Sequence, residues 1–281
     1  GRAWVVKRVL KILGEDAYAM WINNHHNYAW TEMHKGFRNP LFVVRKGATP
    51  AFPGQKGFVG GSMGGMQALE WAIEYPQAVG RLAVIAAPPV SSADHIALNS
   101  VQVEAVMTDP AFNNGHYYDA KPGFGPHQGL ALARRMAILN YRSPSELNDR
   151  FERAWQSGVS PLGGGGRWAV ESYLDFHSNK FTRRFDANSY ITLVEAMNSH
   201  DVGRGRESLE AALASITAKS IVVGISSDRL FPIEDQQLIA DNIGGEIIGG
   251  GLQVIESEFG HDGFLIEDIK LAPMIRALLD A

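Results

Sequence analysis

The stretch Gly-Gly-Ser-Met-Gly-Gly around Ser62 constrains the fold of this chain more than any other feature. Its glycine–x–serine–x–glycine pattern is typical of a sharp turn between a strand and a helix that presents a serine hydroxyl to substrate. Side chains two residues to either side of the serine would make the strand and the helix collide, and Gly60 and Gly64 have none. We therefore expect a strand at residues 57–59, a helix at residues 66–73 and a nucleophilic serine between them.

Glycine is abundant in the chain, with 30 of 281 residues, so the pattern also fits a glycine-rich turn that contains an unrelated serine. The flanking sequence favours the functional interpretation. Residues 81–87 are almost uniformly apolar and stop at Pro88, which is typical of a buried parallel strand. Strand, helix and strand in this order place Ser62 at the carboxyl end of the first strand, where the ligands of open α/β sheets gather.

A helical block follows, and strand signals then return. Over residues 92–215 the helical patterns lie at residues 96–107, 130–141, 144–157, 171–185, 189–197 and 206–216. Ser143 is the expected N-cap of the third helix, because Pro144 suits the first helical position. Strands are expected at residues 220–225 and 252–256, and helices at residues 233–243 and 266–279. The pattern predicts an α/β body over residues 1–91 and 216–281 and a helical lid over residues 92–215.

Residues 1–56 are atypical for such a body. Residues 1–14 have the spacing of an amphipathic helix, residues 41–44 predict a strand, and the sequence between them is irregular. No standard metal-ligand spacing relates the residues that could bind a metal here, which are His25, His26, Glu32 and His34. We interpret them as surface residues and expect no metal site.

The composition excludes several classes of protein. The absence of cysteine excludes disulfides, thiolate metal sites and cysteine nucleophiles, and it suits a reducing cytoplasm. The net charge of −4 gives no sign of electrostatic binding to nucleic acid. Neither a bilayer-spanning apolar run nor a signal-peptide pattern is present, so we expect a cytoplasmic protein that acts on small molecules.

Two residues are placed to activate Ser62. A serine hydroxyl is a weak nucleophile at neutral pH and needs a base, which in turn needs an orienting carboxylate. Asp228 follows one predicted strand directly, and His261 lies in the loop after the next. Alone, Asp228 could be a turn or N-cap aspartate and His261 a loop histidine. Their order in the chain, serine then aspartate then histidine, is that of the α/β-hydrolases.

Longer stretches around these residues resemble the homoserine O-acetyltransferase family, a branch of the α/β-hydrolases. They include Gly-Gly-Ser-Met-Gly-Gly-Met-Gln at residue 60, Ser-Asp-Arg-Leu-Phe-Pro at residue 227 and Gly-His-Asp-Gly-Phe-Leu at residue 260. Further matching stretches lie in the predicted lid, at residues 109–118, 171–174 and 184–190. The resemblance runs from about residue 57 to the C-terminus and implies an α/β-hydrolase fold with a helical lid.

The resemblance also implies an activity. Acetyl-CoA, as a co-substrate and with no bound cofactor, would acylate Ser62, and the hydroxyl of L-homoserine would take the acetyl group in a step of methionine biosynthesis. His261 would act as general base and then acid, Asp228 would orient it, and the backbone N–H of Met63 would donate to the oxyanion. Family members are often homodimers, which makes a homodimer an expectation here. The residues quoted do not separate acetyl from succinyl donors, or homoserine from serine as acceptor.

A zwitterionic acceptor needs both a cation and an anion in its pocket. Arg134 lies at the centre of an apolar helical stripe, and the resemblance assigns an arginine there to the substrate carboxylate. It also fits an arginine that extends from a buried helix into solvent. Asp262 follows the catalytic histidine and would receive the ammonium group, although a turn aspartate before Gly263 would look the same.

The chain departs from the family before the serine turn. Nothing in residues 1–58 matches the family's early strands or the family's loop that supplies the second oxyanion donor. We therefore expect the first strands of the sheet to be missing or rearranged in this chain. Loss of one such donor costs roughly 3–4 kcal/mol of transition-state stabilisation. Asn198 also stands where the family usually has aspartate. Two alternatives to the transferase therefore stay open: a serine ester hydrolase that uses the same three residues, and an inactive relative.

Overall fold

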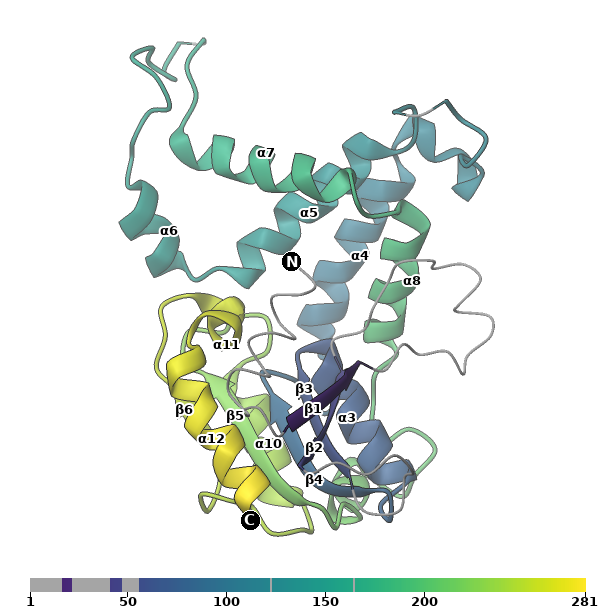
Figure 1. The fold of residues 1–281 in the computed structure, drawn as a ribbon. Coiled ribbons are helices and arrows are strands. Elements are labelled where there is room, and N and C mark those ends of the chain that lie inside the picture. Colours follow the sequence, from purple (N-terminus) through teal and green to yellow (C-terminus); the bar gives the residue numbers. More distant parts are fainter. Residues whose placement is uncertain (1–16, 22–40, 47–55, 122, 164) are drawn as a thin grey trace. The chain divides into compact units, whose positions relative to one another are not determined.

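Residues 17–21, 41–46, 56–121, 123–163 and 165–281 are described by the structure, a computed structural model (Figure 1). They divide into two units. The sheet unit comprises the described residues of Gly1–Val90 together with His200–Ser257 and His261–Ala281. The helical unit comprises Ser91–Ser199 and the tripeptide Glu258–Gly260.

One six-stranded sheet forms the frame of the sheet unit, in the order β1-β2-β3-β4-β5-β6. The strands are β1 (Ala17–Trp21), β2 (Leu41–Lys46), β3 (Lys56–Gly61), β4 (Val79–Ile85), β5 (Lys219–Ile225) and β6 (Gln253–Ile255). From β3 to β6 all neighbours are parallel, whereas β2 pairs antiparallel with both β1 and β3. The strand expected at residues 41–44 is confirmed as β2, and β1 is a strand that the sequence did not predict.

Alternate residues of the central strands face two hydrophobic layers. In β4, Leu82 and Val84 belong to the layer that contains helices α3 (Met63–Glu74), α9 (Leu209–Ala214) and α10 (Ile233–Asn242). Ala83 and Ile85 belong to the layer that contains α12 (Asp268–Asp280). Because successive side chains of a strand point to opposite faces, helices cover both faces of the parallel part of the sheet.

The boundary between the units differs from the one expected from the sequence. The predicted lid extended to residue 215, but residues 200–215 belong to the sheet unit. The reason is packing, because Ala212 and Leu213 of α9 are buried in the same cluster as Leu69 of α3. The helix expected at residues 266–279 is confirmed as α12, and the short helix α11 (Gly263–Ile266) precedes it, with Glu267 between them.

Helices make up the regular structure of the helical unit's described residues. They are α4 (Ala93–Met107), the 3₁₀ helix η1 (Pro110–Gly115), α5 (His127–Tyr141), α6 (Pro144–Phe151), α7 (Ala169–Thr182) and α8 (Ala187–Asn198). Their main core contains Val106, Phe112, Leu130, Phe181 and Tyr190 among its buried residues. The predicted third helix is shorter than expected, because α6 ends before Glu152, which has a φ of 46°.

Two of the lid stretches that carry the family resemblance meet in this unit. The Tyr117 hydroxyl donates to Asp186 at 2.5 Å and accepts a hydrogen bond from the Asn188 N–H at 2.9 Å. The Asn188 side chain donates to the Gly115 carbonyl at 3.0 Å, and Gly115 has a φ of +86° that favours glycine. These stretches therefore hold η1 against the start of α8.

Asn198, where the resemblance leads us to expect aspartate, ends a buried chain of hydrogen bonds. The Asn99 amide donates to the Asn198 side-chain oxygen at 2.7 Å and lies 3.1 Å from Nε2 of His95. Nδ1 of His95 lies 3.3 Å from the Ser91 hydroxyl. Because the Asn99 nitrogen only donates, Nε2 of His95 accepts and Nδ1 carries the proton. A neutral histidine and a neutral asparagine therefore suit each other in this network.

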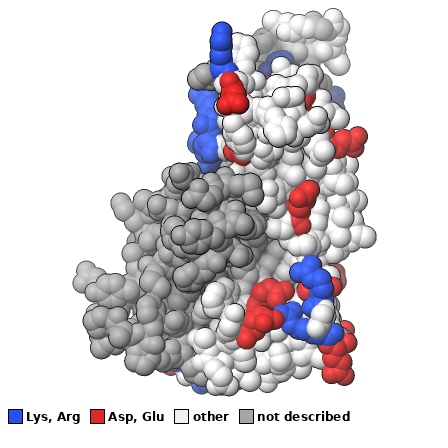
Figure 2. Space-filling view, turned by 90° about the vertical axis from the view of Figure 1, so that its right-hand side faces the viewer, with Lys and Arg blue, Asp and Glu red and all other residues white. Residues whose placement is uncertain are grey.

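Acidic and basic side chains lie close together on the face drawn in Figure 2. In the sheet unit, Arg206 bonds to the carboxylates of both Glu70, at 3.0 Å, and Glu74 of α3. None of the helices in the described part of the chain is long and apolar enough to cross a membrane.

Candidate active site

Ser62 lies at the turn between β3 and α3 in a conformation that non-glycine residues rarely adopt. Its φ is 57° and its ψ is −128°, and its N–H donates to the Ile85 carbonyl of the neighbouring strand at 2.8 Å. A Cβ atom on Gly60 would lie only 2.0 Å from the Gly64 carbonyl oxygen. The strand and the helix therefore approach each other as closely as the sequence pattern requires, and the strained turn holds the serine.

The structure brings together the three residues expected to form a relay. Nε2 of His261 lies 2.7 Å from the Ser62 hydroxyl oxygen, and Nδ1 lies 2.7 Å from Oδ2 of Asp228. Ser62 follows β3, Asp228 follows β5, and His261 lies in the 3₁₀ turn η2 (Gly260–Asp262) after β6. All three stand at the carboxyl ends of parallel strands, where open α/β sheets place their ligands.

The side chain of Asp228 is held by two backbone N–H groups as well as by the histidine. Its side chain is buried, and Oδ1 accepts hydrogen bonds from the N–H groups of Leu230 at 2.9 Å and Phe231 at 3.0 Å. Oδ2 stays available for His261. An ionised carboxylate only accepts, so Nδ1 of His261 carries a proton and Nε2 is left to accept the proton of the Ser62 hydroxyl. This is the tautomer that a general base requires.

Two aromatic rings contact the imidazole of His261, which is only 4% exposed. The Phe231 ring lies edge-on at 5.3 Å between centroids, and the Phe264 ring at 5.5 Å. Gly61 makes room for Phe264, because a Cβ atom on Gly61 would lie 2.5 Å from that ring. Both phenylalanines stand in stretches that resemble the family, but no role was predicted for either, because the sequence does not show which rings pack against the imidazole.

Met63 is the first residue of α3 and directly follows the serine. The first N–H groups of a helix have no partner within the helix, and they carry the positive end of its dipole. No backbone hydrogen bond joins the Met63 N–H to another described residue outside the helix. The group is thus placed to donate to a negative oxygen bound beside Ser62.

The two residues expected to bind the acceptor lie in different units. Arg134 belongs to α5, and its guanidinium lies over the rings of Tyr141 at 5.1 Å and Phe181 at 4.9 Å. No carboxylate among the described residues pairs with it. Asp262 directly follows His261 in the sheet unit and is half-buried. Their roles as substrate contacts remain predictions.

A metal site is not formed by any group of three or more His, Asp or Glu residues in the described ranges. The four residues weighed as metal ligands in the sequence, at positions 25, 26, 32 and 34, lie outside those ranges. The helix expected at residues 1–14 also lies outside them.

Two family models match the chain. The model of the alpha/beta hydrolase fold matches residues 51–268, which is more than half of the chain and includes all three relay residues. The model of the tRNA-splicing ligase RtcB matches residues 2–69, which is less than a quarter of the chain and lies mainly outside the described residues.

Curated relatives agree with the resemblance found in the sequence. The chain is 67% identical over 223 residues to a homoserine O-acetyltransferase from Leifsonia xyli and 64% identical over 222 residues to one from Clavibacter michiganensis. One from Thermobifida fusca is 50% identical over 221 residues. Each alignment covers 79% of this chain but only 56% or 57% of the relative, so the chain spans little more than half the length of these proteins.

Solved structures give the fold. A homoserine O-acetyltransferase from Bacillus anthracis superposes with a TM-score of 0.70 at 24% identity, over 79% of this chain and 59% of that one. An acetylester hydrolase from Corynebacterium glutamicum superposes with a TM-score of 0.66 at 26% identity, over 79% and 60%. The chain therefore belongs to the α/β-hydrolase fold family and, from about residue 51 to residue 281, to the homoserine O-acetyltransferase family within it.

Proposed function

We propose that the protein transfers an acetyl group from acetyl-CoA to the hydroxyl of L-homoserine through an acetyl-serine intermediate at Ser62. The observation that carries the proposal is an assembled Ser62–His261–Asp228 relay in a chain that is 67% identical to a homoserine O-acetyltransferase over 223 residues. The relay supplies the acyl-transfer chemistry, and the relative supplies the identity of the two substrates.

In the first half of the reaction, the Ser62 oxygen attacks the thioester carbonyl of acetyl-CoA. Nε2 of His261 takes the hydroxyl proton as the new bond forms. The carbonyl oxygen becomes negative and accepts a hydrogen bond from the Met63 N–H. When the tetrahedral intermediate collapses, the bond to sulfur breaks, His261 returns the proton to the leaving thiolate, and acetyl-Ser62 remains.

In the second half, the hydroxyl of homoserine attacks acetyl-Ser62. His261 removes the hydroxyl proton and then gives it to the Ser62 oxygen as O-acetylhomoserine leaves. Asp228 stabilises the imidazolium that forms in each half and keeps its ring in place. The outcome depends on whether homoserine or water reaches the acyl-enzyme first.

Binding of homoserine is assigned to Arg134 and Asp262. The guanidinium of Arg134 is planar and can hold a carboxylate through two parallel hydrogen bonds. The Asp262 carboxylate would receive the ammonium group next to the catalytic base. Arg134 supports this role by having no carboxylate partner among the described residues, while two aromatic rings hold its guanidinium.

The direct test is to mix the chain with acetyl-CoA and L-homoserine and to follow release of free thiol. We expect release that depends on homoserine, together with formation of O-acetylhomoserine, and neither in a Ser62→Ala chain. Thiol release at the same rate without homoserine would contradict transfer. Succinyl-CoA and L-serine are the matched alternative substrates, and a faster reaction with either would replace the donor or the acceptor proposed here.

A serine ester hydrolase is the second candidate. It is favoured by the superposition on the acetylester hydrolase from Corynebacterium glutamicum, because the fold and the relay serve both chemistries. This candidate predicts hydrolysis of 4-nitrophenyl acetate that added homoserine does not divert into O-acetylhomoserine. Product analysis by mass spectrometry separates the two candidates.

Three further expectations accompany the transferase. An inactive relative was left open as an alternative because residues 1–58 do not match the family's oxyanion loop, but most of that segment lies outside the described residues and no observation supports impaired activity. The homodimer implied by the family is tested by the mass of the chain in solution. A cytoplasmic location follows from the proposed pathway and is tested by cell fractionation.

A further inference from the structure

The tripeptide Glu258–Gly260 immediately precedes the catalytic histidine, yet its contacts belong to the helical unit. Ser257 before it and His261 after it belong to the sheet unit. The backbone from which the imidazole extends is therefore anchored, on its N-terminal side, to the residues that begin helix α6.

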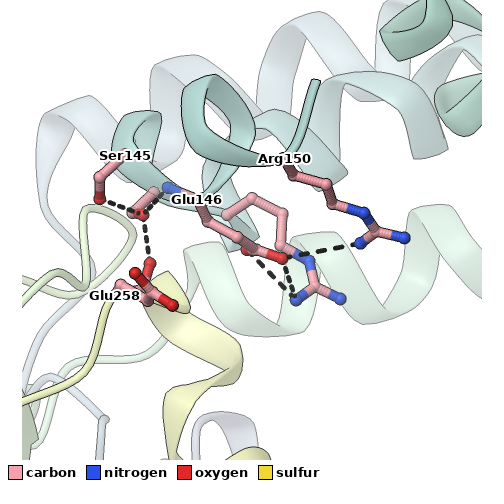
Figure 3. Close-up of polar contacts among 6 residues, drawn as sticks. Ser145, Glu146, Arg150 and Glu258 are labelled. Atoms are coloured by element: carbon pink, nitrogen blue, oxygen red, sulfur yellow. Dashed lines mark hydrogen bonds and ion pairs between the residues drawn. The ribbon is translucent and has the colours of Figure 1, made fainter. Parts of the chain in front are cut away.

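The first anchor is the hydroxyl of Ser143, the N-cap of α6 (Figure 3). Its oxygen accepts a hydrogen bond from the Glu146 N–H at 3.0 Å and lies 2.9 Å from the Ser145 hydroxyl, and it donates to the Glu258 carbonyl. A carbonyl only accepts, so the single hydroxyl proton of Ser143 goes to Glu258, and Ser145 donates to Ser143. Ser143 is 1% exposed, so water does not replace these bonds.

The second anchor is the close approach of Gly260 to the end of α5. Gly260 has a φ of +63°, in the region that favours glycine. A Cβ atom there would lie 2.6 Å from the Tyr141 carbonyl oxygen and 2.7 Å from the Ser143 nitrogen. The tripeptide is thus held at its first residue by a hydrogen bond and at its last by backbone packing.

Charged groups fix the segment that carries Ser143. The buried Glu146 carboxylate accepts two hydrogen bonds from Arg142, at 3.2 and 3.3 Å, and lies 3.9 Å from Arg150 (Figure 3). These contacts connect the residue before Ser143 to the first and second turns of α6. The hydroxyl is therefore presented to Glu258 by a rigid support.

We propose that Ser143 is a positioning residue for His261, because its hydroxyl fixes the backbone of Glu258–Gly260 and so keeps Nε2 within hydrogen-bond reach of Ser62. The proposal rests on the role of His261 as the base in the proposed function. A displacement of about 1 Å in a reacting group can cost on the order of 10²-fold in rate. A lost hydroxyl at residue 143 should therefore reduce the reactivity of Ser62, although it touches neither Ser62 nor His261.

The test measures how fast a fluorophosphonate probe labels Ser62 in the full chain. In this reaction the serine oxygen bonds to phosphorus, fluoride leaves and His261 takes the proton, so neither homoserine nor acetyl-CoA is needed. We expect Ser143→Ala to slow labelling by about 10- to 100-fold. Ser143→Thr, which keeps a hydroxyl, should label within a few-fold of the unmodified chain.

The matched control is Ser92→Ala. Ser92 is the N-cap of α4 in the same unit and accepts a hydrogen bond from the His95 N–H at 3.2 Å, so this change removes a cap without touching Glu258. We expect both alanine variants to lower Tm, Ser143→Ala the more because its hydroxyl is buried, and only Ser143→Ala to slow labelling. Equal labelling rates in the two variants, or a Ser143→Thr chain as slow as Ser143→Ala, would overturn the proposal.

A second readout does not depend on any reaction. We expect the proton on Nδ1 of His261, which faces Asp228, to give a far-downfield NMR signal. This signal should shift or broaden in Ser143→Ala and in Gly260→Ala but not in Ser92→Ala. An unchanged signal in both of the first two would also overturn the proposal. A chain that labels normally but does not acetylate homoserine would refute the proposed function and leave the role of Ser143 intact.

Discussion

Nε2 of the buried His200 donates a hydrogen bond to the carbonyl oxygen of Pro88 at 3.1 Å. Pro88 follows strand β4 in the chain, and His200 precedes helix α9. The hydrogen bond therefore joins the segment before α9 to the segment after β4. Burial lowers the pKa of His200 from 6.5 to about 4, although the bond to Pro88 opposes this change. The group is therefore neutral in the folded chain at neutral pH.

This pKa makes the stability of the sheet unit sensitive to acid. In the unfolded chain this histidine takes up a proton near pH 6.5, and in the folded chain it does so near pH 4. The contribution of His200 to the free energy of unfolding is therefore complete above pH 6.5 and is lost as the pH falls to 4. The loss is about 3 kcal/mol. In urea titrations between pH 4 and pH 7.5, His200→Gln should flatten this dependence, and His127→Gln, which changes an exposed histidine, should not. An equal dependence of stability on pH in all three chains would refute this role of His200.

Asp235 of α10 makes the folded chain less stable as the pH rises, whereas His200 makes it less stable as the pH falls. Burial, and then the charges of Glu234 and Asp228, raise the pKa of its carboxyl from 3.8 to about 6. The folded chain therefore releases this proton at a higher pH than the unfolded chain, and stability falls as the pH rises from about 4 through 6. We expect Asp235→Asn to raise Tm at pH 7.5 and to leave it unchanged at pH 4. The control is Asp241→Asn, which alters an exposed aspartate of the same helix.

Replacement of Asp228, the carboxylate that we propose orients His261, separates orientation of the imidazole from folding. In Asp228→Asn, the amide can still accept from the Leu230 and Phe231 N–H groups, but it no longer fixes the protonated Nδ1 tautomer of His261. We expect thiol release and probe labelling to fall by about 10⁴-fold, the effect seen for the matching change in serine proteases. The circular dichroism spectrum should not change. A loss below 10-fold would show that Asp228 does not orient the base.

Arg134→Lys tests recognition of the acceptor. Lysine keeps the charge but not the planar fork, so the KM for homoserine should rise by 10-fold or more, which corresponds to about 1.4 kcal/mol. Hydrolysis of 4-nitrophenyl acetate should persist. The matched control is Arg135→Lys, because Arg135 pairs with Asp175 at 3.2 Å. An unchanged KM in Arg134→Lys would remove this residue from the acceptor site.

Gly60→Ala tests the close approach at the serine turn. The added Cβ atom would lie 2.0 Å from the Gly64 carbonyl oxygen, so the strand and α3 must separate. We expect lower Tm and loss of probe labelling at Ser62. Gly158→Ala is the control, because its Cβ atom would meet no atom within 4 Å. Normal labelling of Gly60→Ala would mean that the turn is more tolerant than its geometry indicates.

The elements of the parallel sheet could be read from the sequence because their signals are local. The apolar runs at residues 81–87 and 220–225 became β4 and β5 with small changes at their ends. β1 was missed, because Ala-Tyr-Ala-Met-Trp is apolar throughout and shows no alternation of apolar and polar residues. The end of α6 was also missed, since the positive φ of Glu152 has no sequence signature.

Residues of the site were predictable where a motif carries them. The serine turn and the order of Ser62, Asp228 and His261 in the chain predicted that these residues act together. The family resemblance then placed each of them in a matching motif. The contact of Phe231 with the imidazole joins the segment after β5 to the segment after β6, and only the fold brings these two together. The bond from Ser143 to Glu258 spans 115 residues, and no spacing rule relates them.

The anchoring of Glu258–Gly260 by residues 141–143 has a consequence for chimeras between members of the family. A chimera that received the insertion of another family member in place of residues 91–199 would keep Ser62, Asp228 and His261 on the original sheet. Its Glu258 carbonyl would then face whatever residue the donor insertion carries in place of Ser143. A chimera should therefore take the donor's counterpart of residues 258–260 together with the donor's insertion, because these two parts contact each other.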